Sequence, residues 1–172
     1  MKIRKPAFLI ALALCLVTAL FVPQAALTAE AASVVNISSA AGLAKALTDS
    51  KSAAYKLTAD ISGIKKEIRV TGGTKTLDLN GHSIKGSSTA SSLIFVRGGD
   101  LTIKSSASGG MIRNTNNQDA AGCGSGRLTL ESGTLQGLVY GIYQEGGTVN
   151  IKGGTVKGIE NAVKTVKGTL NI

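Results

Sequence analysis

The sequence predicts an all-β protein, a right-handed parallel β-helix of about five coils with a short N-terminal capping helix. One observation is a motif in which two apolar residues flank a third residue; it recurs every 20 to 27 residues and begins at Leu57, Leu77, Leu101, Leu128, Val149 and Leu170. A second is the composition, since 22 of the 172 residues are glycine and only 3% are aromatic. Stacked short strands have such compositions, and helical bundles do not.

Each repeat of about 20 residues contains three strand-like pieces, which cannot bury their apolar faces until neighbouring repeats stack. The first residues of the motif are expected to lie directly over one another. Inward positions of the second and third strands are Ile64, Ile84, Ile112, Leu135 and Val156, then Val70, Ile94, Ala121, Ile142 and Val163. Glycine and serine supply the corners, and the longer coils have insertions at 86–92, 105–108 and 114–120.

Residues 1–31 have the layout of a secretory signal peptide, with a basic start, an apolar run over 7–22 and small residues before the expected cleavage after Ala31. The apolar run is shorter than the roughly 20 residues of a membrane-spanning helix, although a single membrane anchor is the alternative. The protein is therefore expected to be secreted or at the cell surface, and to meet the membrane only through this segment before cleavage.

Residues 32–55 are expected to form a strand and the capping helix, with Ser38 or Ser39 as N-cap and Leu43 and Leu47 facing the first coil. A helix placed there would cover the open end of the interior, as solenoids require. The coils are expected to fill 56–172. Because no second cap is recognisable, we expect the chain to be the N-terminal part of a longer protein or a truncated product.

Charge and cysteine content restrict the function. Without residues 1–31 the chain has 16 basic and 9 acidic residues, a net charge of +7, and the single cysteine Cys123, so it has no internal disulfide. Nucleic acid is not an expected partner, because aromatic stacking platforms are missing. No phosphate-binding loop, metal-ligand set or cofactor motif is recognisable, and the oligomeric state is not defined by the sequence.

Three phrases carry a resemblance to a known family: "TLDLNGHSIKG" at 76–86, "LTLESGTLQG" at 128–137 and "VNIKGGTVKG" at 149–158. Residues 33–172 resemble the pectate-lyase-like (pectin lyase fold) right-handed parallel β-helix superfamily. The first phrase is similar to the early coils of secreted bacterial members, and the others to cell-surface proteins of Gram-positive bacteria. The resemblance implies the fold but no single activity, because the superfamily includes lyases, hydrolases and adhesins.

Polysaccharide lyases of this superfamily use clustered acidic residues to hold Ca²⁺ together with a basic residue, and its glycosidases use paired carboxylates. Asp78, Asp100 and Arg127 come nearest to such a pattern here. The expected stacking places them on neighbouring coils, with the two carboxylates roughly 8 Å apart. Solvated surface charge is the simpler interpretation of these three residues.

Two other reactive side chains have structural interpretations. His82 is expected in a turn without a carboxylate partner, which disfavours an acid–base role. Cys123 is expected to fill a corner near the interior as a small residue. A nucleophilic cysteine would need a histidine nearby, and His82 belongs to a different corner two coils away.

The residue after each inward position of the second strand is Lys65, Lys85, Arg113, Gln136 or Lys157. These side chains are expected to project outward in one column, about 4.8 Å apart. The candidate binding residues are the four basic members of the column together with the corner residues Asn116 and Asn117. Such a column could follow teichoic acid or a uronic-acid polysaccharide. Alternatively, its lysines only maintain solubility and prevent pairing between strand edges.

The sequence therefore predicts a non-catalytic module that displays corner loops and a basic face to a carbohydrate or an anionic cell-wall polymer. The alternative from a different class is the N-terminal part of a carbohydrate-active enzyme, either a polysaccharide lyase or a glycoside hydrolase. A non-functional truncated product is the third interpretation.

Overall fold

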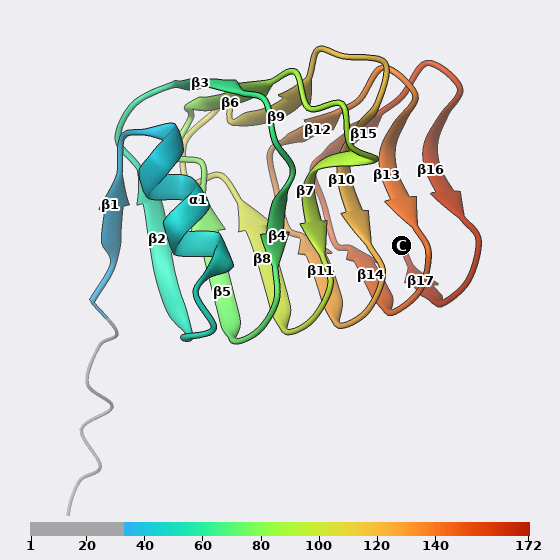
Figure 1. The fold of residues 1–172 in the computed structure, drawn as a ribbon, viewed down its shortest axis with the longest axis horizontal. Coiled ribbons are helices and arrows are strands. Elements are labelled where there is room, and N and C mark those ends of the chain that lie inside the picture. The colour runs from blue at the N-terminus through green and yellow to red at the C-terminus, as the bar shows by residue number, and fades with distance from the viewer. Residues whose placement is uncertain (1–32) are drawn as a thin grey trace, which may run out of the picture. The chain divides into compact units, whose positions relative to one another are not determined.

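A computed structural model describes residues 33–172 as a parallel β-solenoid, which confirms the predicted fold. Three parallel sheets surround one interior, and consecutive strands pass from sheet to sheet (Figure 1). Five complete three-stranded coils precede the last strand, as the repeat predicted. The predicted signal peptide, residues 1–31, lies outside the described residues.

The strands belong to sheets that we name A, B and C. Sheet A contains β1 (Val35–Ile37), β2 (Ala53–Leu57), β5 (Thr74–Asp78), β8 (Asp100–Lys104), β11 (Arg127–Leu130), β14 (Thr148–Ile151) and β17 (Thr169–Asn171). Sheet B contains β3 (Ile61–Ile64), β6 (Ser83–Gly86), β9 (Met111–Asn114), β12 (Thr134–Gln136) and β15 (Thr155–Lys157). Sheet C contains β4 (Ile68–Val70), β7 (Ser92–Val96), β10 (Asp119–Cys123), β13 (Tyr140–Gln144) and β16 (Asn161–Thr165).

The predicted capping helix is α1 (Ala40–Thr48), which lies at the end of the solenoid formed by the first coil (Figure 1). Ser39 is its N-cap, and its hydroxyl oxygen accepts a hydrogen bond from the N–H of Gly42 at 3.1 Å. Leu43 and Leu47 are fully buried in the hydrophobic core. The helix therefore closes the interior of the first coil, as predicted.

Glycines form a column at the corner between sheets C and A. Gly99, Gly126 and Gly147 have φ angles of 69°, 78° and 64°, a left-handed conformation that other residues rarely adopt. The carbonyl oxygen of each accepts the N–H of the first residue of a sheet A strand one coil later, as between Gly126 and Thr148 at 2.9 Å. A side chain at Gly126 would overlap the carbonyl oxygen of Gly99, so this corner requires glycine.

The predicted columns are correct from the third coil onward in sheet A and from the second coil onward in sheets B and C, and wrong before that. In sheet A, Leu101 is in register with Leu128, and the column continues to Val149 and Leu170. Leu77, however, is opposite Ile103 rather than Leu101. The first coil is displaced by two residues in sheet C as well, where Val70 is opposite Val96. A slip of two residues preserves which side chains face inward, so the alternating pattern cannot detect it.

Because of the slip, Leu101 is opposite a lysine instead of Leu77 in the interior column of sheet A. Lys75 lies between Ala53 and Leu101, and its side chain is completely buried. Its ammonium group donates hydrogen bonds to the carbonyl oxygens of Lys51, at 3.0 Å, and Gly72. Burial lowers the pKa of Lys75, and the negative charge of Asp49 partly opposes that shift.

The long insertions lie at corners, as predicted. The loops 87–91 and 115–118 join sheet B to sheet C in successive coils, and residues 105–110 join β8 to β9. Within residues 33–172, the only helix is too short to cross a lipid bilayer.

Replacing the buried cap residue by Leu47→Ala is expected to destabilise the solenoid by about 2–4 kcal/mol, because the lost side chain leaves a cavity against the first coil. Urea unfolding followed by circular dichroism measures the change. Lys45→Ala, on the exposed side of the same helix, is the matched control and should change stability by less than about 0.5 kcal/mol. Equal effects of the two substitutions would show that α1 does not cap the core.

Candidate functional site

Sheet B carries a basic column on its outer face. Lys85 is in register with Arg113, Arg113 with Gln136, and Gln136 with Lys157. Lys85 and Lys157 are exposed, whereas Arg113 and Gln136 are half-buried. Since paired strands lie about 4.8 Å apart, three cationic groups follow the solenoid axis with a single neutral residue among them. The register of these four residues is the predicted one.

Lys65 does not belong to the basic column, contrary to expectation. The register between β3 and β6 changes between Ile61, which is opposite Ile84, and Ile64, which is opposite Gly86. Lys65 follows Ile64 and therefore lies beyond the position of Lys85. The irregularity in β3 moves the lysine from the face of sheet B to the corner between sheets B and C.

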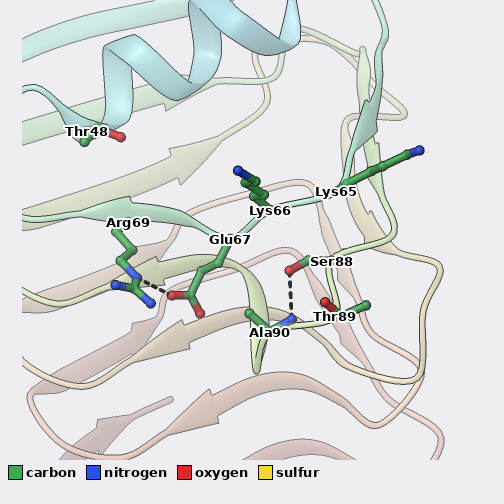
Figure 2. A pocket seen from close by; sticks show the side chains of 8 residues that line it. All are labelled: Thr48, Lys65, Lys66, Glu67, Arg69, Ser88, Thr89 and Ala90. Atoms are coloured by element: carbon green, nitrogen blue, oxygen red, sulfur yellow. Dashed lines mark hydrogen bonds and ion pairs between the residues drawn. The ribbon is translucent and has the colours of Figure 1, made fainter.

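At that corner Lys65 lines a hollow of about 440 Å³, which we call the corner pocket. Its lining comes from the end of α1, the segment between β3 and β4, strand β4 itself and the loop 87–91 (Figure 2). The lining residues are Thr48, Lys65, Lys66, Glu67, Arg69, Ser88, Thr89 and Ala90. The ammonium groups of Lys65 and Lys66 point to opposite sides in Figure 2.

The corner pocket has an excess of positive charge. The Glu67 side chain is only 5% exposed and accepts a hydrogen bond from Nε of Arg69 at 2.7 Å. This ion pair neutralises one cation and leaves those of Lys65 and Lys66. Lys66 and Arg69 could not be recognised from the sequence, because the pocket forms where two consecutive corners stack and neither residue occupies a repeated position.

The candidate residues Asn116 and Asn117 lie in the adjacent corner loop and have different environments. The amide of Asn116 donates to the carbonyl oxygen of Ser88 at 3.3 Å and so connects the two long corner loops. Asn117 is exposed, and its side chain makes no hydrogen bond with residues 33–172. Asn117 is therefore available to solvent or a ligand, whereas Asn116 helps to hold the loop.

Charges on sheet A are arranged differently. Lys56, Asp78 and Lys104 are consecutive members of one register, so the sign alternates from coil to coil. The alternation continues through Glu131 and Lys152, whose charged atoms lie 3.8 Å apart. A column of alternating sign neutralises itself, and the column of sheet B does not.

The expected cluster of Asp78, Asp100 and Arg127 is not formed. Asp78 is opposite Lys104, at the far end of β8 from Asp100, so four residues, or about 13 Å of strand, separate the two aspartates instead of 8 Å. Asp100 pairs with Arg127 at 3.2 Å on the surface. The two-residue slip between β5 and β8 causes this separation.

Asp78 has a structural role, because its carboxylate is buried and hydrogen-bonded to the backbone. It is 8% exposed, and one carboxylate oxygen accepts the N–H groups of Asn80 and Ser106, each at 2.8 Å. Burial acts to raise the pKa of Asp78, but the hydrogen bonds from Ser106 and Asn80 outweigh it and hold the pKa below its usual value. The carboxylate therefore joins the corners of two successive coils.

His82 has a carboxylate partner, contrary to expectation. Its Nδ1 lies 3.4 Å from an oxygen of Asp60, one coil earlier. The same oxygen accepts the backbone N–H of Ser83 at 2.9 Å, which is the main reason that the pKa of Asp60 is lowered. The stacking of two A-to-B corners produces this pair, although 22 residues separate its members.

Cys123 occupies the place expected of a small interior residue. It is fully buried at the end of β10, and burial raises the pKa of its thiol. Among residues 33–172, no three acidic, histidine or cysteine side chains come together as a metal site would require.

Asp119 is a buried carboxylate that was not among the residues predicted from the sequence. It ends the second long corner, is 4% exposed, and accepts the N–H of Tyr140 at 3.0 Å. Burial raises its pKa to about 6; the Tyr140 hydrogen bond opposes this shift and the charge of Glu160 adds to it. Its burial depends on neighbouring coils, which the local sequence does not reveal.

The raised pKa of Asp119 makes stability depend on pH. The folded protein binds this proton more tightly than the unfolded chain, so the contribution is complete below the unfolded pKa of 3.8 and is lost as pH rises through about 6. Asp119→Asn keeps the acceptor for Tyr140 and removes the ionisation. Its stability relative to the natural protein should therefore increase by up to about 3 kcal/mol between pH 4 and pH 7.

Urea unfolding at several pH values measures this difference. Asp100→Asn, at the surface ion pair with Arg127, provides the control for removing one carboxylate elsewhere. A stability difference for Asp119→Asn that stays constant from pH 4 to pH 7 would contradict the prediction.

Comparison with known proteins leaves the family open: no protein-family model matches the chain, and neither does any curated protein or solved structure. The parallel solenoid is compatible with the β-helix superfamily that the sequence phrases resemble.

Proposed function

We propose that this chain is a secreted or cell-surface binding module, without catalytic activity, that holds an anionic carbohydrate polymer along sheet B and the adjoining corner pocket. The observation that carries the proposal is the one-signed column of Lys85, Arg113 and Lys157. Secretion is inferred from the predicted signal peptide in residues 1–31.

A polymer fits this surface better than a small anion. A single exposed ion pair contributes only about 0.2–1 kcal/mol, so one sugar acid or phosphate would bind weakly to any one of these side chains. A chain with regularly spaced negative charges contacts several cations at once, and each further contact is then intramolecular. The parallel register provides the regular spacing of cations that such a polymer can follow.

The corner pocket extends the same surface. The uncompensated charges of Lys65 and Lys66 lie next to the loop 87–91, and Asn117 lies on the corner loop of the following coil. Cations and an exposed amide are suited to carboxylate or phosphate oxygens and to neighbouring hydroxyls. A bound polymer could thus contact the face of sheet B and this corner together.

The contrast with sheet A supports binding over solubility alone. Lysines that only prevent aggregation can stand next to acidic residues, as Lys104 and Lys152 do beside Asp78 and Glu131. Like charges about 4.8 Å apart repel each other, and a negatively charged ligand relieves that repulsion. The alternative interpretation, that the chain is part of an enzyme, lacks the expected group of catalytic carboxylates, because Asp78 and Asp100 are far apart.

The triple substitution Lys85→Gln, Arg113→Gln and Lys157→Gln should weaken binding to purified wall teichoic acid or polygalacturonate about 10- to 100-fold at low salt, since up to three ion pairs are lost. Retention on the immobilised polymers, measured over a range of salt concentrations, tests this expectation. The slope of affinity against salt should also decrease, because fewer counterions are displaced.

A matched control removes the same number of charges from sheet A through Lys56→Gln, Lys104→Gln and Lys152→Gln. It should lower the affinity no more than about threefold, through net charge alone. Equal losses in the two variants would refute a specific role for the basic column, and so would undiminished retention of the sheet B variant.

A further inference from the structure

Three of the four aromatic side chains among residues 33–172 lie outside the core of the solenoid. Tyr55 is in the interior column of sheet A. Phe95, Tyr140 and Tyr143 come from strands β7 and β13 of sheet C. Ile142 faces inward, and its neighbour Tyr143 therefore faces outward. In a chain with so few aromatic residues, this grouping on one face needs an explanation other than core packing.

Phe95 packs on the same face of sheet C as Tyr143. It is in register with Gly122 of the next coil, which in turn is in register with Tyr143. A Cβ atom at Gly122 would lie 2.7 Å from the Phe95 ring, so the ring occupies the space that a side chain would take. The guanidinium group of Arg97 covers the ring at 4.3 Å from its centroid. Phe95 is thereby fully buried, although it lies outside the core. Its ring fills the space over Gly122, which is next to Tyr143 along the sheet.

Tyr140 and Tyr143 form a stacked, half-buried pair of rings. Their ring centroids are 5.8 Å apart and their planes differ by 14°. The rings line a hollow of about 370 Å³, the tyrosine pocket, whose lining residues are Ser91, Gln118, Asp119, Val139, Tyr140, Tyr143, Glu145 and Lys164. This volume is at the lower end of the range for small-molecule sites.

The chemistry of the tyrosine pocket suits a sugar ring. The faces of tyrosine rings are apolar and their hydroxyls are polar, so they can contact the C–H face of a pyranose while neighbouring groups bind its hydroxyls. Gln118, Ser91 and Lys164 supply an amide, a hydroxyl and an amine for those contacts. Aromatic side chains together with a few convergent polar groups are a typical lining of small-molecule sites.

The charge of this pocket differs from that of sheet B. Two carboxylates, Asp119 and Glu145, line it against the single amine of Lys164, and Glu160 is near enough to influence both Asp119 and Tyr140. At neutral pH this excess of negative charge repels uronic acids and phosphates. A ligand of the tyrosine pocket is therefore chemically distinct from the polymer proposed for the basic column.

We propose that the tyrosine pocket is a second carbohydrate-binding site, which takes a pyranose ring without negative charge through contact with the exposed ring surface of the stacked Tyr140–Tyr143 pair. The site lies on the sheet C side of the corner loops, since Ser91 and Gln118 end the two long loops. It goes beyond the proposed function and does not depend on it, because no residue of the basic column lines this pocket.

The chain offers a direct optical test, because it has no tryptophan and only three tyrosines. Tyr55→Phe in the full chain leaves the two pocket tyrosines as the only source of tyrosine emission. Titration with a β-linked glucose hexamer and with an N-acetylglucosamine hexamer should produce a saturable change in emission for at least one of them. A galacturonic acid hexamer should change it at least about tenfold less at equal concentration. An unchanged emission with both neutral hexamers would overturn the proposal.

Substitutions locate the site. Calorimetric titration with the hexamer that binds should show about a tenfold loss of affinity for Tyr143→Ala, whereas Tyr143→Phe, which keeps the ring, should stay within about threefold. The triple sheet B variant should bind the neutral hexamer normally, which separates this proposal from the proposed function. Full affinity in Tyr143→Ala, or a loss in the sheet B variant equal to that of Tyr143→Ala, would refute the assignment. Circular dichroism confirms that each variant is folded.

Discussion

Parallel backbone pairing between successive coils is the constraint on which the rest of this molecule depends. Every strand repeats the course of the strand one coil earlier, and bonds such as Thr148 N–H to the Gly126 carbonyl keep that repeat at the corners. Because the spacing is about 4.8 Å, each outward side chain has a neighbour of known identity along the axis. The charge of a face is therefore a direct consequence of register.

The sequence alone was sufficient for the fold, since a repeat of strand-like pieces with glycine corners has few other solutions. It was also sufficient for the helix, where Ser39, Leu43 and Leu47 have the predicted roles. It was not sufficient for the register of the first coils. Alternation has a period of two, so a slip of two residues leaves the same side chains inward. Lys75 shows the consequence, because its neighbours in the column, Ala53 and Leu101, could be assigned only once the pairing was known.

The same distinction holds for the candidate site: residues in a regular register could be predicted, and residues placed by an irregularity could not. Lys85, Arg113 and Lys157 were predictable because no slip occurs among their sheet B strands, β6, β9, β12 and β15. The corner pocket was not predictable, because a bulge in β3 redirects Lys65. The tyrosine pair was missed for a different reason. Residues 140 and 143 are three apart, which in a regular strand puts them on opposite faces, and their rings meet only because Tyr140 lies at the very start of β13.

The solenoid separates groups of opposite charge that a globular fold would bring together. Its three sheets face different directions, and residues on one sheet contact others mainly along the axis of that sheet. The one-signed column of sheet B and the acidic tyrosine pocket are thus kept apart by the corner loops rather than neutralised by each other, whereas the mixed column of sheet A neutralises itself. The insertions at this corner enlarge the surface between the two sites, and the strands on both sides of it keep their register. The loops 87–91 and 115–118 are joined to each other through the amide of Asn116. The two ligands that we propose would therefore lie on neighbouring faces of a single repeated backbone.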